Sequence, residues 1–370
     1  MGFRLILNSL LLVLFTSFCL KPTAGSSGSV VFIEDSSPKY LRNQPLDSDD
    51  EITPISVPEV AGVASVLLGF APDSSLATES SSKLNKILMP NPFGRPHAVF
   101  LLEVSGLDDI DHSKLQVQTV RKYKLVGSKA SMHLPGEEEV LVTKIEESLD
   151  GDCNAACLDE EFTYLSKLLE GSYSGSVATK DGKLTLPLAR DGALHLHVAR
   201  EAELHFASSL AALVRGINRG VEFHGDVSGI GFNPVELITG RFTGFKALIE
   251  EYENSDIIQQ GAEILQITIS KLFDLLHRSY EGKIVGMIVY NKEESGMVEV
   301  TSSARISRWL EETSTSSDNF TRVYEVLLVR TTLAWITGII LLISTLMGVC
   351  MLMNMPLTRD TLLYSNVKLD

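Results

Sequence analysis

The chain has 370 residues, of which 44% are hydrophobic, and it carries a formal net charge of −15 at pH 7. So acidic a chain lacks the basic face that nucleic acid binding requires, and we exclude nucleic acid as a partner. Its mean hydropathy is nevertheless slightly positive, because long apolar segments lie near both ends.

The N-terminal segment has the three parts of a secretory signal peptide. Arg4 supplies a positive charge, an apolar run extends from Leu5 to Leu20, and the small-residue stretch KPTAGSSGS follows. We expect a signal peptide over residues 1–25, with cleavage after Gly25. An uncleaved anchor is the alternative, but the apolar run is short for a membrane span.

The central part alternates strand and helix patterns, which predicts an α/β luminal domain with a buried sheet over residues 26–304. Short apolar runs predict strands at 28–34, 97–106, 137–145 and 283–290, and a strand pair over 183–199. Amphipathic segments predict helices at 57–70, 161–171, 202–217, 235–252 and 255–280. The last helix is the clearest, because an apolar stripe follows one of its faces at Ile258, Ala262, Leu265, Ile269, Leu272 and Leu276.

The four cysteines fall into different parts of the chain. Cys19 lies in the predicted signal peptide and Cys350 lies in the C-terminal apolar segment. Cys153 and Cys157 remain, in the stretch DCNAAC, and a structural disulfide is the favoured interpretation in an oxidising lumen. A redox pair is the alternative, although its two cysteines are normally separated by two residues rather than three. A zinc site would need two further ligands nearby, and the sequence offers none.

Most signatures of enzymes are absent from the sequence, including GxSxG, the P-loop and HExxH. His195 and His197 would share one face of a strand, with His205 nearby, but ordinary surface or core histidines are the favoured interpretation over a metal site.

The stretch AVFLLEVSGLDDID resembles the strand and turn that open alkaline-phosphatase-like folds. Ser105 stands where those folds carry a metal-binding aspartate, and Asp108, Asp109 and Asp111 lie beyond the turn, out of that register. We therefore expect a degenerate fold of that class, without catalysis, cofactor or metal.

The C-terminal apolar segment, residues 331–353, contains no charged residue. As a helix it would be about 34 Å long, enough to cross a hydrocarbon core of about 30 Å. Together with the signal peptide this predicts a type I membrane protein. Residues 305–330 would form a juxtamembrane stem and residues 354–370 a cytosolic tail.

The tail and several other segments resemble the renin receptor family, the accessory protein 2 of the vacuolar-type proton ATPase. In the tail the resemblance is carried by Asn354, Met355, Pro356, Asp360, Thr361, Leu362, Leu363, Tyr364, Lys368 and Asp370. In the domain it is carried by GSVVF, VPEVAGVASVLLGF, NPFGRPHAVFLLEVSGL, AELHFASSLAAL, the helix at 255–280 and the strand after it, in the same order as in the family. Residues 114–187 match poorly.

The resemblance implies a non-enzymatic accessory and assembly subunit whose span lies inside the ring of proteolipid subunits. Gly338, Ser344, Thr345 and Gly348 are small residues that would allow close approach of other helices. The tail would dock on a cytosolic subunit through Asn354, Met355, Asp360, Leu362, Leu363 and Tyr364. The alternative function is a luminal hydrolase-like enzyme or ligand-binding receptor with a simple type I anchor.

The stem and tail also carry short processing and sorting patterns. Arg305 and Arg308 form a minimal Arg-x-x-Arg at the place of the family's processing site, and two solvated arginines are the alternative. The stretch DNFT makes Asn319 a glycosylation acceptor. Tyr364 with Val367 fits a sorting signal, and Lys368 with Asp370 fits a retrieval terminus for coat or adaptor proteins. These patterns predict a place in the endomembrane system, from the endoplasmic reticulum and Golgi to vacuole-like or lysosome-like compartments.

Overall fold

The structure is a computed structural model that describes residues 28–35, 39–42, 54–72, 76, 78–89, 91, 94–110, 119–127, 129–135, 139–149, 153–189, 192–229, 234–252, 256–292, 296–302 and 319–353. For residues 78, 119–120, 226–229, 302 and 319–331 only the backbone is described. The chain divides into two compact units, Met1–Arg305 and Ile306–Asp370.

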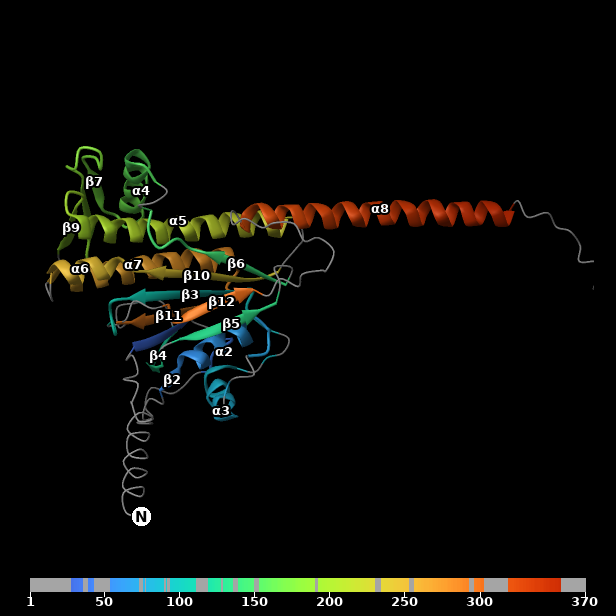
Figure 1. Cartoon of the computed structure of the whole chain (residues 1–370), viewed down its shortest axis with the longest axis horizontal. Coiled ribbons are helices and arrows are strands. Elements are labelled where there is room, and N and C mark those ends of the chain that lie inside the picture. Colours follow the sequence, from blue (N-terminus) through green and yellow to red (C-terminus); the bar gives the residue numbers. More distant parts are fainter. Residues whose placement is uncertain are drawn as a thin grey trace, which may run out of the picture. The chain divides into compact units, whose positions relative to one another are not determined.

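A seven-stranded sheet forms the centre of the first unit (Figure 1). Its strand order is β2 (Ile55–Ser56), β4 (Thr119–Val126), β1 (Gly28–Glu34), β11 (Ile284–Asn291), β3 (Ala98–Ser105), β10 (Val235–Phe242) and β6 (Val140–Lys144). β11, β3, β10 and β6 run parallel, whereas β1 is antiparallel to both of its neighbours. The predicted mixture of strands and helices is confirmed.

The three central strands β1, β11 and β3 are buried along their whole length. They are covered on both faces, which explains their almost continuous apolar sequences. Side chains alternate between the faces: Val31 and Ile33 of β1 join one core cluster, and Val30 and Phe32 join the other.

Helices cover both faces of this sheet. One face packs against α2 (Val57–Leu67) and α3 (Thr78–Ile87), together with a second sheet in which β12 (Val298–Ser302) runs parallel to β5 (Ala130–Leu134). The other face packs against α5 (Glu201–Gly229), α6 (Gly244–Tyr252) and α7 (Asp256–Ser279). Figure 1 shows these layers in profile.

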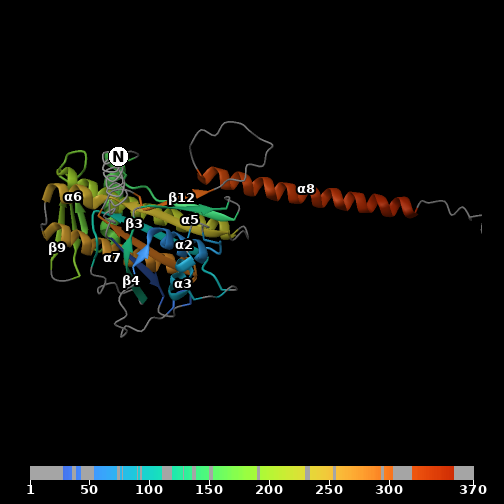
Figure 2. The same cartoon turned by 60° about the horizontal axis from the view of Figure 1, so that its bottom comes forward.

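A small subdomain lies on the outer side of α5. It contains α4 (Ala155–Leu168) and an antiparallel sheet of β7 (Ser172–Ser174), β8 (Lys183–Pro187) and β9 (Ala193–His197). β8 and β9 confirm the predicted strand pair, and Gly192 between them has φ +141°. Figure 2 shows β9 beside α6 at one end of the unit.

The apolar stripe of α7 is confirmed, because Ile258, Leu265, Ile269, Leu272 and Leu276 are buried, while Ala262 is half-buried. The prediction of a single helix over residues 235–252 is wrong. Residues Val235–Phe242 form β10, and only Gly244–Tyr252 form a helix. Gly240 marks the strand, since a Cβ there would lie 3.0 Å from Ile145 Cβ, closer than a neighbouring side chain comfortably allows.

The last strand of the first unit, β12, is held by a buried carboxylate as well as by its neighbour β5. Glu103 of β3 accepts the amide of Val298 at 2.6 Å and that of Met297 at 3.2 Å. Arg241 lies 3.4 Å from the same carboxylate and 2.8 Å from Glu147. Glu103 therefore fixes β12 to the central sheet.

In the second unit the described residues form one helix, α8 (Asn319–Met353). Within it Thr332–Met353 is a stretch of 22 residues that is long and apolar enough to cross a membrane.

Candidate functional site

The carboxyl edge of the central sheet carries the turn that the sequence singled out. β3 ends at the buried Ser105, and Gly106 follows with φ +97°. The Gly106 amide donates to Asn291 O at 2.8 Å and so joins the ends of β3 and β11. A Cβ at Gly106 would lie 3.1 Å from Phe245 Cβ, so both the backbone conformation and the space require glycine.

The aspartates beyond this turn are engaged by neighbouring side chains. Ser29 Oγ donates to Asp108 O at 3.0 Å and lies 3.5 Å from Asp109 Oδ1. Lys122 of β4 forms an ion pair with Asp109. Asp111 lies outside the described residues. Among the residues that the structure describes, no group of three His, Cys, Asp or Glu side chains is placed to hold a metal ion.

A hollow of about 460 Å³ opens between this turn and the start of α7. Asp109, Asp256 and Glu263 contribute carboxylates to its lining. Burial, with the charge of Asp109, raises the pKa of the nearby Tyr290 phenol, which therefore stays neutral. An acidic lining repels a phosphate ester unless a cation intervenes.

The predicted histidine pair does share the outer face of β9. His195 Nδ1 lies 3.1 Å from Thr185 Oγ1, and His197 Nδ1 lies 3.3 Å from Glu203 Oε2. His205 lies on α5, two residues after Glu203. His195 thus contacts β8, and His197 contacts α5.

Glu203 forms a buried polar cluster that sequence reasoning missed. Its carboxylate, which is 0% exposed, accepts the His197 amide at 2.5 Å, Arg200 Nη1 at 2.8 Å and the Tyr252 hydroxyl at 2.5 Å. Burial alone would raise the pKa of Glu203, but the hydrogen bonds from Tyr252, His197 and Arg200 outweigh it and lower the pKa. The ionised carboxylate thus joins β9, α5 and α6.

A second buried cluster lies at the start of β10 and was also missed. Glu236 accepts from the Tyr280 hydroxyl, and its other oxygen lies 2.6 Å from His224 Nδ1. The ring centroids of His224 and Tyr280 lie 4.1 Å apart, with the ring planes tilted by 36° to each other. Burial and the Glu236 charge raise the pKa of Tyr280, so it donates as a neutral phenol. The cluster links α5, β10 and the end of α7.

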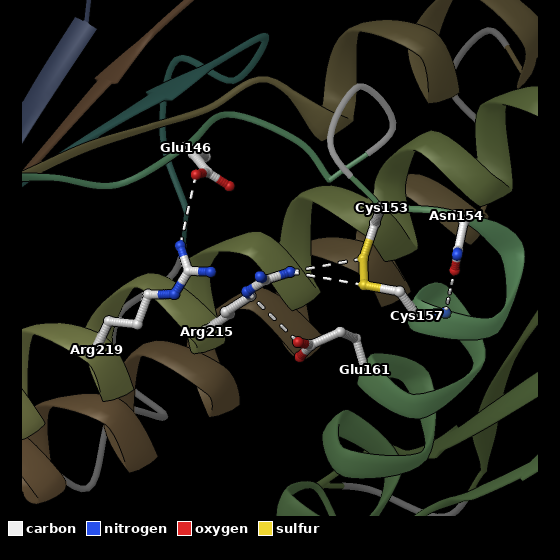
Figure 3. The surroundings of a disulfide bond; sticks show 7 residues. All are labelled: Glu146, Cys153, Asn154, Cys157, Glu161, Arg215 and Arg219. Carbon is white, nitrogen blue, oxygen red and sulfur yellow. Dashed lines mark hydrogen bonds and ion pairs between the residues drawn. A yellow bond between two sulfur atoms is a disulfide. The ribbon is translucent and has the colours of Figure 1, made fainter. Parts of the chain in front are cut away.

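Cys153 and Cys157 are joined by a disulfide at the start of α4 (Figure 3). Asn154 caps the helix, and its side chain accepts the Cys157 amide at 2.9 Å. Arg215 of α5 reaches both sulfur atoms, with Nη1 3.5 Å from Cys153 Sγ and 3.8 Å from Cys157 Sγ. The short spacing DCNAAC pointed to the disulfide, but nothing in the sequence pointed to Arg215.

A further hollow of the α/β unit lies between α2, α3 and residues 94–96, with a volume of about 660 Å³. Its lining is mostly apolar and includes the partly exposed Val66 and Met89. Arg95 also lines this hollow, and its guanidinium lies so close to Gly69 that a Cβ there would overlap it.

In the apolar stretch of α8, hydroxyl side chains donate hydrogen bonds to backbone carbonyls of the same helix. Thr337 Oγ1 donates to Leu333 O at 2.9 Å, Ser344 Oγ to Leu341 O at 3.0 Å, and Thr345 Oγ1 to Leu341 O at 2.9 Å. At 3.6 residues per turn six small and hydroxyl residues fall on one face of the helix, on which Leu341 also lies. These residues are Ala334, Thr337, Gly338, Ser344, Thr345 and Gly348.

Several predicted sites lie outside the described residues. They are the signal peptide over residues 1–25, the processing pair Arg305 and Arg308, and the tail residues Asn354, Met355, Asp360, Leu362, Leu363, Tyr364, Val367, Lys368 and Asp370. Asn319 begins α8, but its side chain is not described.

The fold and these contacts define an α/β domain linked to a helix that is long and apolar enough to span a membrane. Residues 26–292 match the model of a family described as a domain of unknown function (DUF7794), and the chain belongs to that family. The match covers the α/β unit almost to its end and stops before β12 and α8. No curated protein and no solved structure matches the chain.

Proposed function

We propose that this chain is a non-enzymatic accessory and assembly subunit of the vacuolar-type proton ATPase. In this proposal Thr332–Met353 crosses the membrane within the ring of proteolipid subunits, the α/β unit lies in the lumen, and residues 354–370 dock on a cytosolic subunit. The resemblance of the tail and of the ordered luminal segments to the renin receptor family supports the partner. The protein would then reside in the endomembrane system, where the pump acidifies organelles.

One structural observation carries the proposal furthest, namely the surface of the apolar stretch of α8. It contains no charged residue, and the hydroxyl groups of Thr337, Ser344 and Thr345 bond to carbonyls of their own helix. Such a helix offers neighbours close van der Waals contact along a small-residue face but no strong polar bond. A ring that rotates around a fixed helix needs this combination, because specific polar contacts would have to break at every step.

The α/β unit is compatible with a non-catalytic role. We propose that it is a degenerate alkaline-phosphatase-like domain in which Ser105 replaces the metal-binding aspartate. Asp109 is paired with Lys122 and approached by Ser29, which explains how the carboxylate can be retained for structure rather than for metal binding. The domain would then act through its surface during assembly.

Copurification tests the proposal directly. The tagged full chain, extracted in mild detergent, is expected to recover proteolipid and cytosolic stalk subunits of the pump. A Gly348→Leu variant places a large side chain on the small-residue face and is expected to reduce that recovery several-fold. Ile343→Phe, which adds bulk to the opposite face, is the matched control and is expected to leave recovery unchanged. Equal recovery by both variants, or recovery of no pump subunit by the wild type, would refute the proposal.

A chimera separates anchoring from assembly. The apolar stretch and the tail are replaced by an unrelated single span with an unrelated tail, and vacuolar pH is measured in cells that lack the natural protein. We expect the chimera to reach the membrane but to fail to restore acidification. Full restoration would show that the α/β unit acts without this span.

The hollow between α2 and α3 favours a second candidate, a luminal ligand-binding receptor. Its volume of about 660 Å³ and largely apolar lining fit a small apolar molecule, and Arg95 offers a partner for an anionic group. Extraction of the purified full chain, followed by mass spectrometry, tests this candidate. A stoichiometric ligand that a Val66→Trp variant loses would support it, because Val66 lines this hollow and its side chain is partly exposed.

A further inference from the structure

The disulfide at the start of α4 lies against a cation from another helix (Figure 3). Arg215 approaches Cys153 Sγ at 3.5 Å and Cys157 Sγ at 3.8 Å, and its Nε lies 3.6 Å from Glu161. About a quarter of the Arg215 side chain is exposed. Arg215 is more than fifty residues away from both cysteines in sequence, so tertiary packing creates this contact.

A guanidinium stabilises sulfur far more in one redox state than in the other. The sulfur atoms of a disulfide are neutral and are weak hydrogen-bond acceptors, whereas a thiolate accepts a charge-assisted hydrogen bond. Cys157 also lies in the first turn of α4, where the end of the helix favours negative charge. Both features stabilise the reduced pair relative to the oxidised one.

We propose that the Cys153–Cys157 disulfide is a thiol–disulfide exchange site for a dithiol reductant, and that Arg215 is the positioning residue that stabilises the thiolate. Cys157 is the half-buried member of the pair and Cys153 the buried one, so an incoming thiolate reaches Cys157 first. This inference does not rest on the proposed role in the proton pump.

The exchange balances as two successive displacements. A thiolate of the dithiol attacks Cys157 Sγ, the Cys153–Cys157 bond breaks, and Cys153 leaves as a thiolate beside Arg215. In the mixed disulfide, the first sulfur of the dithiol is bonded to Cys157. The second thiolate of the dithiol attacks that first sulfur, and Cys157 leaves as a thiolate. Two electrons pass from the dithiol to the chain, the dithiol becomes a disulfide, and the new thiolates take protons from water according to pH.

Opening the bond leaves the surroundings in place. The cross-link spans a sequence separation of only 4, so it restricts the unfolded chain less than a cross-link over a longer loop would. Asn154 still caps α4, and Leu158 and Phe162 remain buried in the core. Reduction therefore changes the charge and reactivity at the start of α4 while the fold persists.

Equilibration in glutathione redox buffers tests the proposal. The full chain is used in detergent, with Cys19 and Cys350 replaced by serine in every variant, and the reduced fraction is read by alkylation and mass spectrometry. The midpoint is the glutathione redox ratio at which half of the chain is reduced. We expect Arg215→Gln to shift this ratio about fivefold towards more reducing buffers, because the variant loses one partly screened charge contact. Arg219→Gln is the matched control, because Arg219 lies one turn further on α5 and pairs with Glu146 rather than with sulfur. Its midpoint is expected to stay at the wild-type value.

Two further variants distinguish charge stabilisation from a purely structural role of Arg215. Glu161→Gln removes the ion pair of Arg215 but keeps the guanidinium, so the midpoint should stay or move towards easier reduction. Arg215→Lys keeps the charge and should recover part of the shift, and it replaces Arg215→Gln if that variant does not fold. Equal midpoints for the wild type and the Arg215 variants, or a wild-type disulfide that resists excess dithiothreitol, would overturn the proposal.

Discussion

Replacing Glu203 by glutamine should destabilise the α/β unit by about 3 kcal/mol. One carboxylate oxygen accepts from Arg200 at 2.8 Å and Tyr252 at 2.5 Å, and the other accepts the His197 amide at 2.5 Å. A glutamine amide has one acceptor oxygen. If that oxygen keeps Arg200 and Tyr252, its NH₂ group faces the His197 N–H, and two donors oppose each other.

The magnitude follows from these contacts. An unpaired, largely buried N–H costs about 1–3 kcal/mol. The two retained bonds lose the strength that a charged acceptor gives them, about 0.5–1 kcal/mol each. The ion pair to Arg200 adds little, because more than half of the Arg200 side chain is exposed.

The measurement is urea unfolding of the full chain in detergent, followed by far-UV circular dichroism. Tryptophan fluorescence is unsuitable, because Trp309 and Trp335 both lie outside the unit Met1–Arg305. Glu201→Gln, an exposed change in the same helical turn, is the control and should alter the free energy of unfolding by less than about 0.5 kcal/mol. A loss below about 1 kcal/mol for Glu203→Gln would refute the reasoning about the buried acceptor.

Four further outcomes are expected, with free energies of unfolding measured in the same way. Serine at both Cys153 and Cys157 should cost about 2 kcal/mol, the loop entropy of a five-residue ring, and a loss above about 4 kcal/mol would contradict that account. Phe206→Ala should cost about 4 kcal/mol, because its buried ring packs on two other phenylalanines with centroids 5.2 and 5.6 Å away. Gly106→Ala should cost about 1–3 kcal/mol through its positive φ and the nearby Phe245 side chain, and a neutral change would show that the turn relaxes. The pKa of Asp159 is lowered because three hydrogen bonds outweigh the effect of its burial. The stabilisation that its ionised carboxylate gives the fold is therefore fully present above the unfolded pKa of about 3.9 and is lost as pH falls through the folded pKa. Asp159→Asn should remove this part of the acid-dependent loss of stability.

The buried strands and the longest helix could be predicted because each carries its own pattern. β1, β3 and β11 are short apolar runs, and the α7 stripe repeats at helical spacing. β10 could not be separated from α6 by apolar content, since both are apolar and a single residue, Thr243, joins them. Gly240 and Gly244 were the available signs of a change of structure.

β4 was missed although its sequence does alternate. Tyr123 and Leu125 are buried, and the lysines at 122 and 124 between them are exposed. This period of two is typical of a strand that faces the core on one side. The alternation could have been used to predict β4, and the sequence analysis did not use it.

The polar clusters lie beyond any local pattern. Arg215 meets the disulfide across about sixty residues, and Glu236 meets Tyr280 across 44 residues. Neither pair has a characteristic spacing, because the packing of α5 against α4 and of α7 against the sheet determines the contact. The short spacing of Cys153 and Cys157, by contrast, is local, and the sequence pointed to their disulfide.

The attachment of β12 has a mechanical consequence. β12 is the last described strand before the chain continues to α8, so a pull transmitted along the backbone from that helix reaches the folded α/β unit at Val298–Ser302 first. There the load meets the ladder to β5 and the grip of Glu103 on the amides of Met297 and Val298. The load is therefore shared between a strand ladder and a buried side chain of the central sheet. Glu103 and the β5 ladder are thus the first contacts that such a pull would load.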